Sequence, residues 1–161
     1  MAKDDPAPRL SACGEIARLH DPDRFLCALL APAARRETLF VLAALNHELA
    51  RAREVASNPL IALMRLTWWR ETAEEAAAGR PPRRHEVATP LHAEIASGRI
   101  LAEDVVALCE AREMEAEEAG VPSLEAFQAW LRGTSGRLAV MAGRALGAPS
   151  AALPALEAAG A

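Results

Sequence analysis

The sequence predicts an all-α fold, because its composition and its helix start and stop signals both favour helices. Ala and Leu, the strongest intrinsic helix formers, supply most of the 52% of residues that are hydrophobic, while β-branched residues are few. Helix start and stop signals also recur along the chain, as capping residues, prolines and glycines between apolar segments. The length of 161 residues suits one domain spanning 1–161.

The expected helices are bounded by these signals. They cover Arg9–His20, Pro22–Ala31, Pro32–Glu54, Pro59–Ala78, Thr89–Ser97, Ala102–Ala119 and Leu124–Leu146. Two of them begin with a proline directly after a capping residue, Asp21 or Asn58, which is typical of a helix start. Gly133 and Gly136 fall inside the last helix, where each costs about 1 kcal/mol against Ala. These two glycines therefore predict a kink or a close backbone contact.

The segment Pro32–Glu54 is the helix around which we expect the others to pack. It is apolar nearly all round over Leu39–Leu45, and a helix that is apolar on every side is buried. It becomes polar from Asn46 onward, which indicates that its last third faces a cavity or a partner. One face of the helix carries Leu39, Ala43, Asn46, Ala50, Arg53 and Glu54. We expect the functional site on that face.

Charge and cysteine content argue against several classes of function. A net charge of −4 argues against a nucleic-acid partner, which would require a basic face. Cys13, Cys27 and Cys109 form no CxxC motif, so we expect reduced, buried thiols rather than a disulfide or metal ligands. The first residues resemble neither a signal peptide nor a transit peptide, and the uncharged runs are too short to span a bilayer. We expect a cytoplasmic protein, with peripheral contact to the inner membrane as the alternative.

Several stretches resemble the squalene/phytoene synthase family. They are FLCALLAP from Phe25, RRETLFVLAALNHELARAREVASNPLIALMRLTWWRETAEE from Arg35, REMEAEE from Arg112 and LEAFQAWLRGTSGRLAVMAGRALG from Leu124. The likeness covers most of Asp21–Gly147 and corresponds to the N-terminal half of the family. It implies the all-α isoprenoid-synthase fold.

The resemblance also implies a chemistry whose residues are altered here. Family enzymes join two prenyl diphosphates head to head, and two aspartate-rich motifs on facing helices hold Mg²⁺ against the leaving pyrophosphate. In the register set by flanking residues, the first motif falls on Ala50–Glu54, which reads A-R-A-R-E and keeps a carboxylate only at Glu54. The second motif is expected after Gly147, and the given sequence reaches Ala161 without it. We therefore expect no catalytic residue and no metal ligand.

The segment NHELARAREVASNPLIALMRLTWWRET resembles one branch of the family more than the carotenoid or sterol enzymes. That branch contains assembly factors for respiratory complex I and their bacterial relatives, in which the aspartates are also degraded. The likeness implies a non-catalytic binding or assembly-type helper near a membrane complex. The alternative is a Mg²⁺-dependent head-to-head prenyltransferase of isoprenoid biosynthesis, or one half of such an enzyme. Mg²⁺ is an expected cofactor only under that alternative.

The polar end of the central helix is a candidate site for an anionic headgroup. Its residues are Asn46, His47, Ala50, Arg51, Arg53 and Glu54. Because guanidinium groups match phosphate oxygens, a prenyl or phospholipid phosphate is the ligand that this patch predicts. The competing interpretation is an ordinary helical charge lattice, in which Glu48 pairs with Arg51 three residues on.

Other polar clusters have a structural interpretation beside a functional one. The acids of Glu71–Glu75 suggest either a divalent-ion site or a solvated helix face. The arginines of Arg80–Arg84 suggest either a contact with anionic lipid or a solvated loop. His85 and His92 have no third ligand at metal spacing, which argues against zinc. Because adjacent helical residues point apart, one member of Trp68-Trp69 is expected to pack inward.

The likeness to one half of a fold predicts an incomplete helical array. The apolar wall around Leu39 and Leu42 would then be exposed, or covered by a second copy or a partner. We therefore predict a homo-oligomer or a partner-dependent protein.

Overall fold

The computed structural model describes residues 10–116 and 121–161, and within those ranges it contains helices and no strand. The α-helices are α1 (Ala12–His20), α2 (Pro22–Leu29), α3 (Ala33–Glu54), α4 (Pro59–Ala77), α5 (Ala88–Ala96), α6 (Ala102–Glu113), α7 (Leu124–Leu131), α8 (Arg137–Leu146) and α9 (Leu153–Gly160). The all-α prediction is therefore confirmed. Residues 117–119, expected to end the sixth helix, and Arg9, expected to begin the first, lie outside the described residues. Helix α6 passes into a 3₁₀ turn at Met114–Ala116.

The predicted caps explain where several helices begin. The side chain of Asp21 accepts a hydrogen bond from the backbone N–H of Arg24, and that of Asn58 accepts one from Ile61. Ser123 caps α7 in the same way. Each bond satisfies a backbone donor that the first helical turn leaves without an intrahelical partner.

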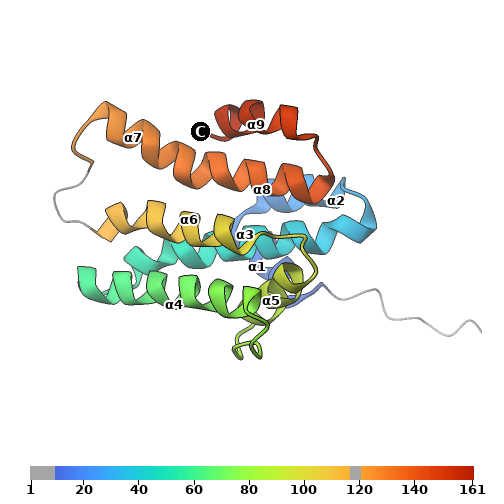
Figure 1. Cartoon of the computed structure of the whole chain (residues 1–161), viewed down its shortest axis with the longest axis horizontal. Coiled ribbons are helices and arrows are strands. Elements are labelled where there is room, and N and C mark those ends of the chain that lie inside the picture. The colour runs from blue at the N-terminus through green and yellow to red at the C-terminus, as the bar shows by residue number, and fades with distance from the viewer. Residues whose placement is uncertain (1–9, 117–120) are drawn as a thin grey trace, which may run out of the picture.

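Helix α3 crosses the middle of the molecule, as its sequence predicts. It contacts α1, α2, α4, α5, α6 and α8 (Figure 1). Every residue from Phe40 to Leu45 is buried, and Leu49 and Ala52 continue the buried side. Burying a side chain such as Leu or Val stabilises the fold by about 1.5–3 kcal/mol, so this run is a main source of stability.

The remaining helices cover α3 from different sides. Helices α4 and α6 lie side by side, while α7 and α8 form one long run above them, on which α9 folds back (Figure 1). Between α7 and α8, residues Arg132–Gly136 form a π-helical turn. A Cβ on Gly136 would lie 2.8 Å from the carbonyl oxygen of Glu157 in α9. The close backbone contact expected from the glycines is therefore present.

Candidate functional site

Asn46, the first polar residue after the buried run of α3, belongs to a network that joins three helices. Its Oδ1 accepts a hydrogen bond at 2.7 Å from Nη2 of Arg112, which is buried in α6. Nη1 of Arg112 donates at 2.8 Å to Glu115, and the indole N–H of Trp130 in α7 donates to the same carboxylate oxygen at 2.9 Å. Asn46 therefore holds α3 against α6. Its partner Arg112 lies 66 positions away, so helical periodicity could not identify the pair.

His47 lies on another side of α3. Its ring stacks on His20 at the end of α1, with ring centroids 4.0 Å apart and planes 10° from parallel. Burial lowers the pKa of His47 below its usual value, and the neighbouring His20 and Arg51 add to that shift. The structure therefore favours the neutral imidazole, which packs without electrostatic repulsion from these groups.

The last turns of α3 carry the other predicted binding residues. Arg51 approaches the buried Glu48 at 3.4 Å, which is the pair expected from an ordinary charge lattice. Ala50 is half-buried, while Arg53 and Glu54 are exposed at the end of the helix. The predicted residues thus lie in three surroundings rather than around one centre. A phosphate site at this end of α3 stays a prediction, with Arg53 as its exposed cation.

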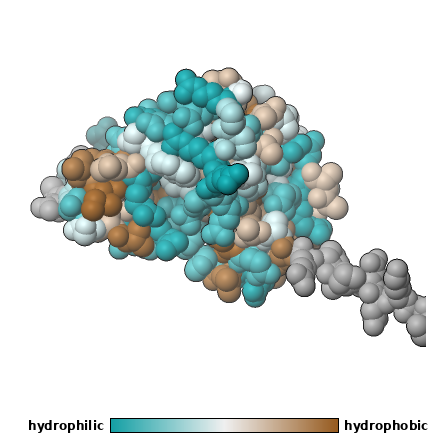
Figure 2. All heavy atoms as spheres, turned by 90° about the horizontal axis from the view of Figure 1, so that it is seen from below, coloured by the Kyte–Doolittle hydropathy of each residue, from teal (hydrophilic) through white to brown (hydrophobic). Residues whose placement is uncertain are grey.

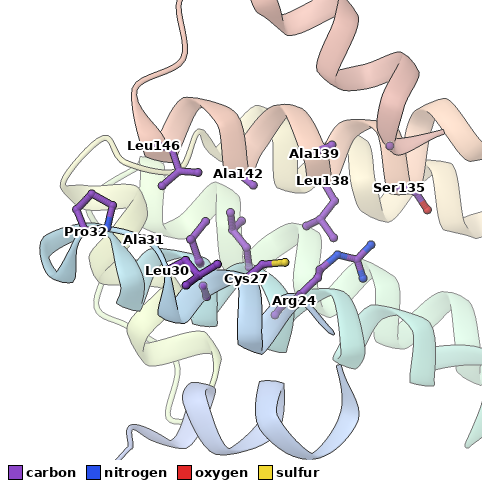
Figure 3. A pocket seen from close by; sticks show the side chains of 15 residues that line it. Arg24, Cys27, Leu30, Ala31, Pro32, Ser135, Leu138, Ala139, Ala142 and Leu146 are labelled. Carbon is purple, nitrogen blue, oxygen red and sulfur yellow. The ribbon is translucent and has the colours of Figure 1, made fainter. Parts of the chain in front are cut away.

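An apolar cavity of about 610 Å³ adjoins the apolar end of the α3 face on which the functional site was predicted. It lies between α2 and α3 on one side and α8 with the end of α9 on the other (Figure 3). Leu39, Leu42 and Ala43 contribute from α3, and Leu138 and Ala142 face them from α8. The cavity therefore adjoins the apolar half of the predicted α3 face. It does not reach the polar end of that face, where Asn46 is hydrogen-bonded to Arg112.

Polar groups occur at one end of this cavity. Figure 3 shows Arg24 and Ser135 at that end and Pro32 and Leu146 at the other. Nη1 of Arg24 also contacts Asp21 at 2.6 Å. Ser135 lies in the π-helical turn, and the sequence predicted an irregularity there but not a cavity residue.

The cysteine prediction needs one correction. Cys13 and Cys109 are buried and free, as expected, but Cys27 is exposed and lines the cavity. It lies on the outer side of α2, which packs inward through Phe25 and Ala28.

The basic loop and the acidic part of α4 bind each other. Arg83 donates hydrogen bonds to Glu75 and Glu71, and its guanidinium lies over the ring of Trp68 at 5.2 Å. The hydrogen bond from Arg83 lowers the pKa of Glu75 below its usual value. Among the residues that the structure describes, no group of three His, Cys, Asp or Glu side chains could hold a metal ion. Trp69 is the member of the tryptophan pair that packs inward.

A sequence model of squalene/phytoene synthase matches residues 17–161. The chain belongs to the squalene/phytoene synthase family. No solved structure matches it significantly.

Several curated relatives of this family member carry the name "NADH dehydrogenase (ubiquinone) complex I, assembly factor 6". The human protein is 40% identical over 70 residues, which is 44% of this chain and 21% of the human one. The mouse protein is 27% identical over 135 residues, which is 84% of this chain and 40% of the mouse one. The chain thus spans at most two fifths of the length of these relatives.

The residues at the family's first metal-binding position do not fit Mg²⁺. Hard cations such as Mg²⁺ take oxygen ligands. Ala50 offers a methyl group, Arg51 is a cation that approaches Glu48, and Arg53 adds a second positive charge. Glu54 is exposed at the end of α3.

None of the helices in the described part of the chain combines the length and the apolar character needed to cross a bilayer.

Proposed function

We propose that this family member is a non-catalytic binding protein that assists the assembly of respiratory complex I. The observation that carries the proposal is the segment Ala50–Glu54, which offers two arginines and one exposed carboxylate where a metal cage would be needed. The names of the relatives support the same reading, because they describe assembly factors rather than synthases. We expect the protein in the cytoplasm, where a peripheral contact with the inner membrane would bring it to its target.

The finer part of the proposal is a retained lipid site. The cavity lies against Leu39 and Ala43, which share a helical face with Ala50 and Arg53. A prenyl or acyl chain would lie in the apolar cavity, and its phosphate would reach a guanidinium group. Arg24 lines the cavity, while Arg53 lies about 15 Å further along α3 than Ala43 and would hold the phosphate only of a chain that extends past Asn46.

Titration of the purified protein with farnesyl diphosphate, without added metal, tests the lipid site. A bound chain is expected to raise the melting temperature and to slow the reaction of Cys27 with N-ethylmaleimide, because Cys27 lines the cavity. Arg53→Gln is expected to weaken binding and leave the protection at saturation intact. No thermal shift and no protection at millimolar ligand would exclude the site.

Complementation tests the assembly role. In the organism that makes this protein, deletion of its gene is expected to reduce assembled NADH dehydrogenase on native gels, and the wild-type gene is expected to restore it. An unchanged amount of assembled complex in the deletion strain would contradict the proposal. Because this readout needs no ligand, it fails independently of the lipid site.

A Mg²⁺-dependent prenyltransferase, or one half of it, is the second candidate. The observation that favours it is the apolar cavity, whose volume of about 610 Å³ suits a prenyl chain. Incubation with farnesyl or geranylgeranyl diphosphate and Mg²⁺ would then release pyrophosphate, and both Glu54→Gln and a chelator would abolish the release. Detection of a metal-dependent hydrocarbon product would replace the non-catalytic proposal.

A further inference from the structure

A second cleft lies between α3 and α4, away from the lipid cavity. Its volume is about 420 Å³, and its apolar wall is formed by Ile61, Met64 and Trp68 of α4. Its polar lining comes from Glu48, from Arg65 and from the imidazole ring of His85 in the loop before α5.

Glu48 and Asn46 are two residues apart and therefore lie on nearly opposite sides of α3. The cleft is thus separate from the face that carries the proposed lipid site.

The apolar wall continues onto the molecular surface. Leu60 and Met64 are 65% and 63% exposed, and Ile61 is 38% exposed. Figure 2 shows that hydrophobic side chains gather at one end of the molecule when it is seen from below. Exposed apolar side chains beside a cleft are typical of binding sites.

Glu48 lines the cleft with incomplete pairing. Its side chain is 9% exposed, and among the residues that the structure describes its carboxylate pairs only with Arg51, at 3.4 Å, which is long for a charge-assisted hydrogen bond. A carboxylate can accept about four hydrogen bonds, and a buried charge is costly unless it is well paired. Glu48 therefore has capacity for a donor supplied by a ligand, and an ammonium group has the complementary charge.

Arg65 gives the same cleft a positive group. It is exposed on α4, and within residues 10–116 and 121–161 it forms no ion pair. Arg51 and Arg65 together outweigh Glu48, so the surroundings do not suit a simple cation. A ligand that carries one positive and one negative group would pair with both Glu48 and Arg65.

His85 adds a hydrogen-bond donor to the lining. Its Nδ1 accepts hydrogen bonds from the backbone N–H groups of Val87 and Ala88, at 3.1 and 3.4 Å. The proton of the neutral ring therefore lies on Nε2, which can donate to an anionic group. Its ring is also fixed against Trp69, with centroids 5.3 Å apart.

We propose that the cleft between α3 and α4 binds a small zwitterion with an apolar body, of which an apolar α-amino acid is the simplest case. Its ammonium group pairs with Glu48, its carboxylate pairs with Arg65, and its side chain packs on Met64 and Trp68. This site goes beyond the proposed assembly role, because it would bind a second, polar ligand on the side of α3 opposite the proposed lipid site.

Calorimetric titration with L-phenylalanine tests the proposal, with phenethylamine and 3-phenylpropanoate as analogues that lack one charge each. L-Phenylalanine is expected to bind saturably and at least about tenfold more tightly than either analogue, since each loses one charge-assisted contact. Glu48→Gln and Arg65→Gln are each expected to weaken its binding by about tenfold or more. Glu74→Gln and Arg84→Gln, which alter exposed charges outside the cleft, are the matched controls and should bind like the wild type.

Two further readouts keep the test decisive. The melting temperature of each variant shows whether its fold is intact. Phenethylamine should bind no more weakly, and if anything more tightly, to Arg65→Gln, because a like charge is removed, while Glu48→Gln should weaken its binding. The proposal is overturned if L-phenylalanine gives no saturable heat at tens of millimolar. It is equally overturned if phenethylamine binds as tightly as L-phenylalanine, or if folded Glu48→Gln and Arg65→Gln proteins bind normally.

Discussion

At the scale of single residues, buried charged groups join helices that are distant in sequence. Glu94 in α5 is 6% exposed, accepts a hydrogen bond from Thr38 of α3 at 2.7 Å, and binds Arg99 through two contacts at 2.7 and 2.9 Å. Burial raises the pKa of this carboxyl, but the hydrogen bonds from Arg99 and Thr38 outweigh it and hold the pKa below its usual value. The ionised form therefore fastens α5 to the central helix.

The variant Glu94→Gln tests this role through its pH dependence. At pH 7 we expect a loss of about 1–3 kcal/mol, because the charge-assisted bonds to Arg99 become neutral ones. A carboxyl with a lowered folded pKa stabilises the protein above its unfolded pKa, and this contribution is lost as the pH falls through the folded value. Denaturant unfolding should therefore show the gap between wild type and variant shrinking below about pH 4.5. A gap that stays constant or widens in acid would contradict the argument, and the exposed Glu103→Gln is the control.

Thiol reactivity should separate Cys27 from the other two cysteines. Burial raises the pKa of Cys13 and of Cys109 to about 12, and nearby charges modify this effect. Since the thiolate is the reactive form, both should resist alkylation in the folded protein, whereas the exposed Cys27 should react. Mass spectrometry after N-ethylmaleimide treatment should find a single modified thiol in native protein and three after unfolding. Rapid modification of Cys13 or Cys109 under native conditions would show that the core opens more readily than the packing implies.

At the scale of helices, local signals predicted the starts better than the interiors. The Asp-Pro and Asn-Pro pairs place α2 and α4 correctly because a cap acts within one turn, through the side chains of Asp21 and Asn58. The π-helical turn was not predicted, since its extra residue depends on what packs against α7 and α8. Thr134 stabilises the turn by donating to the carbonyl of Trp130 at 2.7 Å. Glycine content indicates a close approach but cannot tell which helix makes it.

The variant Gly136→Ala probes that close approach. Its new Cβ would lie 2.8 Å from the Glu157 carbonyl oxygen, so α9 must shift away from the long run of α7 and α8. We expect a loss of about 1–3 kcal/mol in the free energy of unfolding, the usual cost of overpacking. Hydrogen exchange should show faster exchange concentrated in α9. Gln128→Ala, at an exposed position of α7, should leave both measurements unchanged, and a neutral Gly136→Ala would mean that α9 is not held this closely.

At the scale of the whole molecule, the sequence predicted the central helix but not the arrangement around its polar end. A run such as Phe40–Leu45 can be recognised as buried from composition alone, because no side of it is polar. The pairing of Asn46 with Arg112, and of Asp104 with Arg137 and Arg144, depends on how α6 and α8 fold back. Residues on the predicted face of α3 therefore do not share one set of neighbours in the folded protein. The candidate site was predictable as a face and not as a set of contacts.

The exposed leucines around the apolar cavity make self-association or partner binding the expected behaviour of the molecule. Leu30 is 90% exposed and Leu146 is 49% exposed, and both line the cavity. At about 25 cal/mol per Å² of apolar surface, covering such a patch favours association. We expect light scattering to find an oligomer, or a monomer that binds a hydrophobic dye strongly. Leu30→Glu should reduce either property, because a charge at the opening opposes burial.

The matched control for this last prediction is Leu124→Glu, which places the same charge on an exposed leucine of α7 outside the cavity. It should leave the oligomeric state and the dye signal as they are in the wild type. If both variants reduce association equally, general surface charge is responsible and the cavity face has no special role. A wild-type protein that is a stable monomer and does not bind the dye would contradict the prediction directly, because the leucines would then be exposed without a binding function.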